Sequence, residues 1–303
     1  MALPTYASPL EKLWYWTFRV ICGLVFLFLI APILIVIPLS FNIEPYFTFT
    51  EKMLALDPDG YSLRWYDGLL TFGMQMPDAP RDGAWWADVW HNATWVNAAK
   101  NSIIIGVFST LLATFLGTLA ALGLSRPEMP WRRAIMAILL SPMIVPLIIT
   151  ATGLFFFYSM TGLANSYIGV ILAHATLGMP FVIITVTATL VGFDQSLTRA
   201  AANLGAPPST AFFRITMPLI LPGVISGALF AFVTSFDEVV VVLFIAAHDQ
   251  QTIPRQMWNG IREQISPAIL AVATILVIVS IALLTTVELL RRRSERLRGV
   301  TPG

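Results

Sequence analysis

Long apolar runs separated by polar stretches dominate this chain of 303 residues. A bilayer core about 30 Å thick is crossed by about 20 apolar residues in helical conformation. Six runs reach that length, which predicts an all-α polytopic membrane protein with six transmembrane helices. The expected spans are Leu13–Phe41, Ser102–Leu124, Ala134–Met160, Tyr167–Phe193, Leu219–Ala247 and Ala268–Leu290.

The first run has a second possible interpretation, as a cleaved signal peptide. Its apolar stretch is too long for that, and no small-residue cleavage pattern follows Ser40. We therefore expect a retained span. The composition supports the membrane assignment, because 12% of the residues are charged where soluble domains carry about 25%. The mean hydropathy is +0.77.

Positive charge is distributed unevenly between the two sides that these spans define. One side receives twelve Lys and Arg residues and the other six, and cytoplasmic loops carry the excess. Both termini are therefore expected in the cytoplasm, with a tail at 1–12, a transmembrane domain at 13–290 and a basic tail at 291–303. Two long connections result, an outer segment at 42–101 and a cytoplasmic segment at 194–218.

Residues suited to catalysis or nucleotide binding are sparse. Lys12, Lys52 and Lys100 are the only lysines and none follows a glycine, so the chain has no phosphate-binding P-loop. The three histidines and Cys22 lack the spacing of zinc ligands, and no serine stands in a nucleophile elbow. The net charge of +1 argues against nucleic-acid binding. We expect no enzyme activity, metal, cofactor or nucleic-acid partner for this chain alone.

The cytoplasmic segment 194–218 is rich in small residues. Within Thr198–Ala206 we expect a helix of small residues that ends at Gly205. Glycine is frequent at the C-terminal cap of a helix. Pro207 and Pro208 then start a second helix, because proline is tolerated in a first turn. The smooth surface of such a helix-turn-helix suits insertion into a cleft on another protein. Alternatively, the small residues allow close packing against the spans.

This segment resembles the coupling motif of ABC-importer permeases, Glu-Ala-Ala…Gly…Ile-x-Leu-Pro. Two positions depart from the motif, since Arg199 stands where the family usually has Glu and Met217 replaces Leu. The first departure puts the usual carboxylate contact with the ATPase in doubt. The positions that match the ATPase-coupling motif are Arg199, Ala200, Ala201, Gly205, Ala206, Ile215 and Pro218.

The resemblance extends over most of Ser62–Leu290 and implies the type I ABC-importer permease fold. Such a permease subunit lies in the bacterial inner membrane, in contact with lipid, and works with a second homologous permease. The resemblance also implies two cytoplasmic ATP-binding subunits, which use ATP and Mg, and an external substrate-binding protein.

Two acids, Asp237 and Glu238, interrupt the fifth apolar run. An ionisable residue inside a span costs several kcal/mol and is functional by default. At 1.5 Å per residue both lie about 13–15 Å from the outer end of that run, and His174 lies about 10 Å below the same surface. We expect these three residues, with Ser235 and Trp258, to line a substrate pathway. Carboxylates without an opposing cation favour a cationic passenger.

Other roles for these residues remain open at the level of the sequence. Asp237 or Glu238 could pair with a neighbouring chain, or with Arg255 or Arg262 at the outer surface. His174 could be a buried histidine satisfied by one hydrogen bond.

Two motifs refine the resemblance. Ser235-Phe236-Asp237-Glu238 and Pro254-Arg255-Gln256-Met257-Trp258 are similar to permeases of polyamine (spermidine/putrescine) importers, and the chain resembles the second, shorter permease of the pair. Related permeases carry ferric iron, phosphonates, thiamine or opine-type amino acids, which stay as alternatives. Ile253–Ser266 has the apolar spacing of an amphipathic surface helix, either a gate, a docking site or an anchor.

Together these features predict an alternating-access importer in which Ala200–Ala206 transmits the motion of the ATPases. A different class of protein, a self-sufficient ion-coupled secondary transporter, would use Asp237, Glu238 and His174 as a proton relay. A membrane scaffold without a passenger is a third interpretation. The coupling motif favours the importer over both.

Overall fold

The computed structural model describes residues 8–126, 128–194, 196–263 and 266–297, which form helices and one isolated β-bridge, between Asn42 and Tyr61. The chain divides into two compact units, Met1–Phe72 with Gly260–Gly303, and Gly73–Asn259. Four parts of the predicted elements lie outside the described residues: 1–7 of the N-terminal tail, 195 of the cytoplasmic segment, 264–265 of the surface helix and 298–303 of the basic tail.

The first unit contains the N-terminal and C-terminal helices. Its elements are α1 (Pro9–Leu39), α2 (Glu51–Leu54), η1 (Pro58–Gly60), α3 (Arg64–Thr71) and α14 (Ala268–Leu297). The helix α1 begins with a capping box, because Ser8 Oγ accepts from the amide of Glu11 and the Glu11 carboxylate accepts from the amide of Ser8. The most apolar window of α1 has no residue buried inside this chain, whereas α14 contacts both α1 and α3.

The first part of the expected outer segment is held together by Asn42. Its side-chain nitrogen donates to the carbonyls of Tyr46 and Thr48, at 3.0 and 2.9 Å. The indole nitrogen of Trp65 on α3 donates to the Asn42 carbonyl at 2.7 Å. These bonds tie the turn after α1 to the start of α3.

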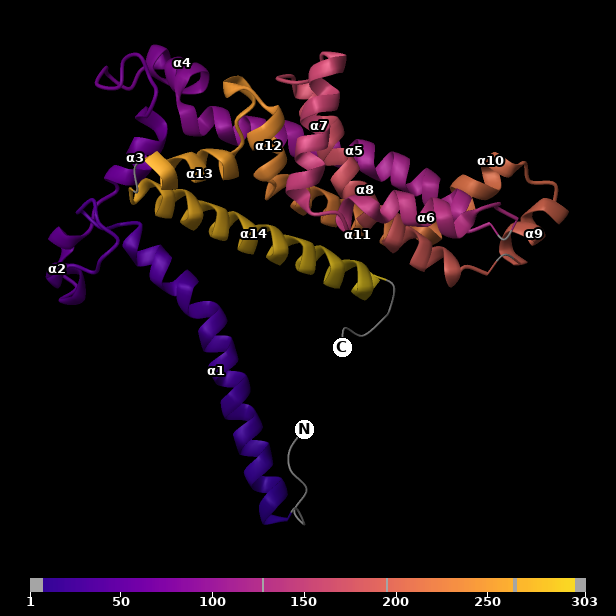
Figure 1. Cartoon of the computed structure of the whole chain (residues 1–303). Helices are drawn as coiled ribbons and strands as arrows, with labels where there is room; N and C mark the ends of the chain where they lie inside the picture. The colour runs from indigo at the N-terminus through magenta and orange to yellow at the C-terminus, as the bar shows by residue number, and fades with distance from the viewer. Residues whose placement is uncertain (1–7, 127, 195, 264–265, 298–303) are drawn as a thin grey trace. The chain divides into compact units, whose positions relative to one another are not determined.

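The second unit is built on three long helices, α5 (Thr94–Leu124), α8 (Tyr167–Val191) and α11 (Met217–Phe236), which pack on one another. Figure 1 shows α9 and α10 at one end of this bundle, here called the α9 end, and α4 at the other, the α4 end. The remaining elements are α4 (Gly83–Asn92), α6 (Arg132–Leu140), η2 (Ser141–Met143), α7 (Leu147–Thr161), α9 (Ser196–Asn203), α10 (Pro208–Ala211), the π-helical turn η3 (Phe212–Thr216), α12 (Val240–Ile245), η4 (His248–Gln250) and α13 (Ile253–Glu263), whose last residues belong to the first unit.

The expected third span is not one straight helix. The pair Arg132–Met143 and Leu147–Thr161 is bent by 96° at the break between them. Pro142 and Pro146 account for the break, because proline has no amide hydrogen to donate and disfavours helix in the residue before it.

The number of spans agrees in part with the prediction. Four helices are long and apolar enough to cross a membrane, Pro9–Leu39, Thr94–Leu124, Tyr167–Val191 and Pro208–Phe236, and the bent pair counts as a fifth if it is one span. The part Ala268–Ala282 of α14 is a shorter apolar helix. The fifth predicted run also differs, because α11 ends at Phe236 and α12 follows as a separate short helix.

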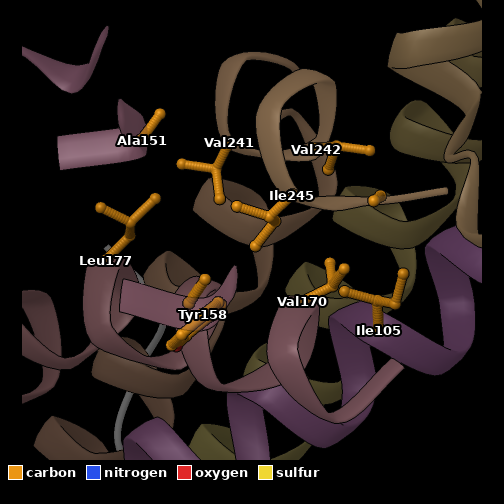
Figure 2. Close-up of a cluster of buried hydrophobic side chains, with 10 residues drawn as sticks. Ile105, Ala151, Tyr158, Val170, Leu177, Val241, Val242 and Ile245 are labelled. Atoms are coloured by element: carbon orange, nitrogen blue, oxygen red, sulfur yellow. The ribbon is translucent and has the colours of Figure 1, made fainter. Parts of the chain in front are cut away.

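The short helix α12 lies inside a hydrophobic cluster. Figure 2 shows Val241, Val242 and Ile245 of α12 among buried side chains from α5, α7 and α8. All three have at most 1% of their surface exposed. This burial fixes α12 against the bundle although the helix is only six residues long.

The second part of the expected outer segment is organised around Asp88 of α4. Its carboxylate accepts from the amides of Gln75 and Met76 and from the side-chain nitrogen of Asn92. These hydrogen bonds, that of Asn92 above all, hold the pKa of Asp88 below its usual range. An ionised Asp88 therefore ties the loop after residue 73 to α4.

The contact between α8 and α11 depends on glycine. A Cβ on Gly227 of α11 would lie 2.5 Å from Thr185 Oγ1 and 2.8 Å from Val182 Cα on α8. Both distances are too short, and the second contact is with backbone, so the two helices would have to separate.

We predict that Gly227→Ala destabilises the second unit by about 1–3 kcal/mol, the usual cost of overpacking a core. The matched control is Gly153→Ala on α7, where a Cβ would have no neighbour within 4 Å. Thermal unfolding in detergent measures both variants. An equal unfolding temperature for the Gly227 variant and the control would contradict the close α8–α11 contact.

Candidate functional site

The two predicted acids lie at a break in the helix, not within one. The amide of Asp237 donates to Val233 and closes α11, and α12 begins three residues later. The Glu238 carboxylate accepts from the amide of Val241 at 2.8 Å. Glu238 thus satisfies a free amide in the first turn of α12, as a helix N-cap does.

The same break gives the two acids different surroundings. Glu238 is 7% exposed, whereas Asp237 is an exposed residue. Both positions look alike in the sequence, but in this chain Asp237 is exposed and Glu238 is buried. The depth predicted along a continuous helix does not apply to either residue, because the helix ends at Phe236.

Arg255, a possible ion-pair partner for these acids, binds backbone carbonyls of α12 instead. Its guanidinium nitrogen Nη1 donates to the carbonyls of Val242 and Ala246, at 2.9 and 2.7 Å. Those carbonyls lie at the C-terminal end of α12, where a cation is favourable. The helix α12 therefore has an acid at its first turn and a guanidinium at its last.

His174 and Ser235 lie within hydrogen-bond distance of each other, in agreement with the alternative of a buried histidine satisfied by one hydrogen bond. The His174 Nδ1 lies 2.8 Å from Ser235 Oγ, which lies 2.9 Å from Ser109 Oγ. This chain of hydrogen bonds joins α8, α11 and α5, and all three side chains are at most 4% exposed. The His174 Nε2 has no hydrogen-bond partner among the described residues. Hydrogen bonds of this kind hold helices together within membranes.

Ser109 is a member of this group that sequence reasoning missed. A serine inside an apolar run is common, and nothing in the sequence places it beside a residue 126 positions later. Trp258, in contrast, lies on α13 with 45% of its surface exposed, away from the His174–Ser235 hydrogen bond. The amphipathic helix expected from Ile253 is confirmed over Ile253–Glu263.

The segment 194–218 forms the predicted helix-turn-helix. The helix α9 ends in a Schellman motif, because the amide of Gly205 donates to Ala202 and that of Ala206 donates to Ala201. Gly205 has a φ of +81°, a conformation that favours glycine. The second helix begins at Pro208, as predicted.

The start of α9 is held by Asp194. Its carboxylate accepts from the hydroxyl and the amide of Ser196, at 2.7 and 2.8 Å. These two bonds, with a smaller contribution from Arg199, keep the pKa of Asp194 below its usual range. The unusual Arg199 therefore has an acidic group near it within its own segment.

The surface of this segment is more apolar than the small residues suggested. Leu204 is 88% exposed and Phe213 is 68% exposed, while Arg199 and Ala200 are exposed and Ala201 is buried. Ile215 and Ala206 are half-buried and Pro218 is exposed. The sequence analysis relied on the small residues of this segment. The large apolar residues in a segment expected outside the bilayer are the signal that could have predicted this exposed apolar surface.

Metal binding has no support in the described part of the chain, where no group of three or more His, Cys, Asp or Glu residues is placed to hold a metal ion.

Three comparisons with known proteins bear on this site. The pattern of the family described as binding-protein-dependent transport system inner membrane component matches residues 113–298. The chain is 30% identical to the spermidine/putrescine transport system permease protein PotC of Haemophilus influenzae over 271 residues, 89% of this chain and 95% of that protein. It is 30% identical to the putrescine transport system permease protein PotI of Escherichia coli over 281 residues, 90% of this chain and 88% of that one.

The fold also has a counterpart among solved structures. A chain in the crystal structure of a bacterial ABC transporter involved in the import of the acidic polysaccharide alginate aligns with a TM-score of 0.70. The alignment covers 94% of this chain and 99% of that chain at 15% sequence identity. At this identity the likeness concerns the fold alone.

We predict that Glu238→Ala destabilises the protein by about 0.5–2 kcal/mol, the usual cost of removing a helix N-cap. The matched control is Asp237→Ala, which removes an exposed carboxylate one position earlier and is expected to leave stability unchanged. The measurement is the thermal unfolding temperature of both purified variants. Equal stability of the two would mean that Glu238 does not cap α12.

Proposed function

Because the chain belongs to the family of binding-protein-dependent transport system inner membrane components, we propose that it is the permease subunit of an ATP-driven importer of polyamines such as spermidine and putrescine. The observation that carries the substrate class is the similarity to two polyamine permeases over about nine-tenths of the chain. The family resemblance inferred from the coupling motif is confirmed. An accessible carboxylate, Asp237, supports a cationic passenger.

The proposed topology has six spans in the bacterial inner membrane with both termini in the cytoplasm. The excess of Lys and Arg on one side supports it. In this topology residues 1–12 and 291–303 are cytoplasmic, residues 42–101 face outward, and the bent pair α6–α7 together crosses the bilayer once.

Family membership implies ATPase and binding-protein partners in general. The proposed assembly is more specific: this chain, a second homologous permease, two cytoplasmic ATP-binding subunits and an external binding protein. ATP and Mg would be used by the ATPase subunits, and this chain would bind no cofactor of its own. The lack of a P-loop lysine supports that division of labour.

The helix α9 and the turn after it are proposed to dock on the ATPase. The exposed Leu204 and Phe213 offer apolar surface for that contact, and Arg199, Ala200, Ala201, Gly205 and Ala206 shape the helix that presents it. Ile215 and Pro218 lie where the segment enters α11. A displacement of α9 would then reach the bundle through the turn at Gly205 and the consecutive helical elements α10, η3 and α11.

The proposed substrate pathway passes Asp237, whose carboxylate is exposed at the end of α11. His174, Ser235 and Glu238 would shape the pathway from behind, since all three are buried. Trp258 on α13 would lie nearer the outer surface. These roles follow from burial and from the break after Phe236.

We predict that the transporter reconstituted in proteoliposomes with its binding protein and ATP takes up radiolabelled spermidine or putrescine and not a neutral sugar. Asp237→Asn should lower that uptake about tenfold or more, because hydrogen bonds to charged groups contribute about 1.5–3 kcal/mol. Asp237→Glu keeps the charge and should retain most of the uptake. A wild-type complex that imports no polyamine would refute the proposed substrate, and normal uptake by the Asn variant would remove Asp237 from the pathway.

We also predict that Leu204→Asp lowers the amount of copurified ATPase about tenfold, because burying a leucine contributes about 1.5–3 kcal/mol. The control is Leu54→Asp, a substitution of another highly exposed apolar residue, 72% exposed in α2 of the outer segment. Copurification is quantified by the ratio of subunits after affinity purification. An undiminished ratio for the Leu204 variant would place the ATPase contact elsewhere.

A further inference from the structure

A cavity of about 390 Å³ lies at the α4 end of the bundle, lined by residues of α4, α5, α8 and the turn at 248–251. Tyr167 in its wall is the first residue of α8, whose last residue, Val191, leads to α9. At 1.5 Å per residue the cavity and the α9 end are about 36 Å apart along α8, enough to span a bilayer. If α9 docks on the ATPase, the cavity opens on the outer side.

The cavity has a rigid wall because Asn101 of α5 holds the turn. The Asn101 side-chain nitrogen donates to the carbonyls of Asp249 and Gln251, at 2.8 and 2.9 Å. The Tyr167 hydroxyl lies 2.7 Å from Asn101 Oδ1 and 2.9 Å from the Asp249 carbonyl. The next residue, Ser102, accepts from the amide of Ile253 at 2.8 Å. Asn101 is 6% exposed, so the position of Asp249 is set by buried hydrogen bonds.

Three side chains of the cavity wall each donate a hydrogen bond within the protein. The Asn97 side-chain nitrogen donates to the His91 carbonyl at 2.9 Å, and that of Asn92 donates to Asp88 at 2.6 Å. The Lys100 ammonium donates to the Trp90 carbonyl and lies 4.5 Å from the centre of its ring. The Asn97 side-chain oxygen accepts no hydrogen bond within the described residues, so it is available to a ligand that donates hydrogen bonds.

Asp249 supplies the charge that such a ligand requires. Its carboxylate is exposed and has no hydrogen-bond or ion-pair partner within the described residues. Only its main-chain carbonyl is used by Asn101 and Tyr167. A free carboxylate beside neutral acceptors matches an alkylammonium group, which has three donors and one positive charge.

We propose that this cavity binds one ammonium group of a polyamine before the solute enters the membrane, with Asp249 as the counter-charge and Asn97 as a neutral acceptor. This inference rests on the proposed function and adds a second binding site to the proposed substrate pathway. Tyr167 and His174 are seven residues apart on α8, about 10 Å along its axis, and His174 contacts Ser235, two residues before Asp237. Asp237 is then the next carboxylate of the proposed pathway for a cation that leaves Asp249.

The test uses the complete transporter in nanodiscs, without its binding protein, and measures equilibrium binding of radiolabelled putrescine. Asp249→Asn should weaken this binding about tenfold or more, since it removes a charge-assisted contact, and Asp249→Glu should restore most of it. The matched control is Asp59→Asn, which neutralises an exposed acid in η1 of the other unit and should bind as the wild type does. The main-chain bonds to Asn101 do not need the Asp249 side chain, so the Asn variant should fold.

Uptake in proteoliposomes separates this inference from the proposed function. If the wild type imports polyamine and Asp249→Asn binds putrescine as well as the wild type does, the cavity is not a polyamine site and the proposed function stands. If the Asn variant loses affinity for the binding protein and keeps its affinity for free putrescine, the cavity receives a partner side chain and the inference is wrong. If the wild type imports no polyamine, the proposed function and the inference both fail.

Discussion

A backbone amide that leaves a helix inside a membrane must find its hydrogen-bond partner within the protein, because lipid offers none. The break between α11 and α12 meets this requirement with two charged side chains. Glu238 accepts from the amide of Val241 at the first turn of α12, and Arg255 donates to two carbonyls at its last turn. The buried cluster around Val241, Val242 and Ile245 depends on this placement, as does the exposure of Asp237 just before it.

The second unit contains one bent pair of helices and three long helices that pack on one another. Pro142 and Pro146 interrupt the third predicted span, which bends by 96°, whereas α5, α8 and α11 pack along their lengths with glycine at contacts such as Gly227. The elements α10, η3 and α11 follow one another without a gap, whereas α9 is joined to α10 through the turn at Gly205. In the proposed coupling, a displacement at α9 passes through this turn before it reaches the helix that leads to Asp237.

Local chemistry explains what the sequence could predict. The helix end at Gly205 and the surface helix from Ile253 each depend on neighbouring residues, and each is confirmed. The apolar runs are local as well, and four of them, or five with the bent pair, form helices long and apolar enough to cross a membrane. The bend at Pro142 had a local signal as well. The unequal burial of Asp237 and Glu238, the approach of Ser109 to Ser235 and the bonds from Asn101 to the turn at Asp249 depend on contacts between residues up to 150 positions apart, which no window of sequence contains.

The distribution of partners among charged groups favours a passage for cations. Two cations bind backbone carbonyls: Arg255 Nη1 donates to those of Val242 and Ala246, and the Lys100 ammonium donates to that of Trp90. Neither forms an ion pair with an acid within the described residues. Asp237 and Asp249 therefore stay available, while Glu238, the acid that is engaged, accepts from a neutral amide. Backbone carbonyls accept hydrogen bonds from these two cations, so the cations do not occupy the two exposed carboxylates. In the proposed pathway these carboxylates bind an ammonium group briefly and release it.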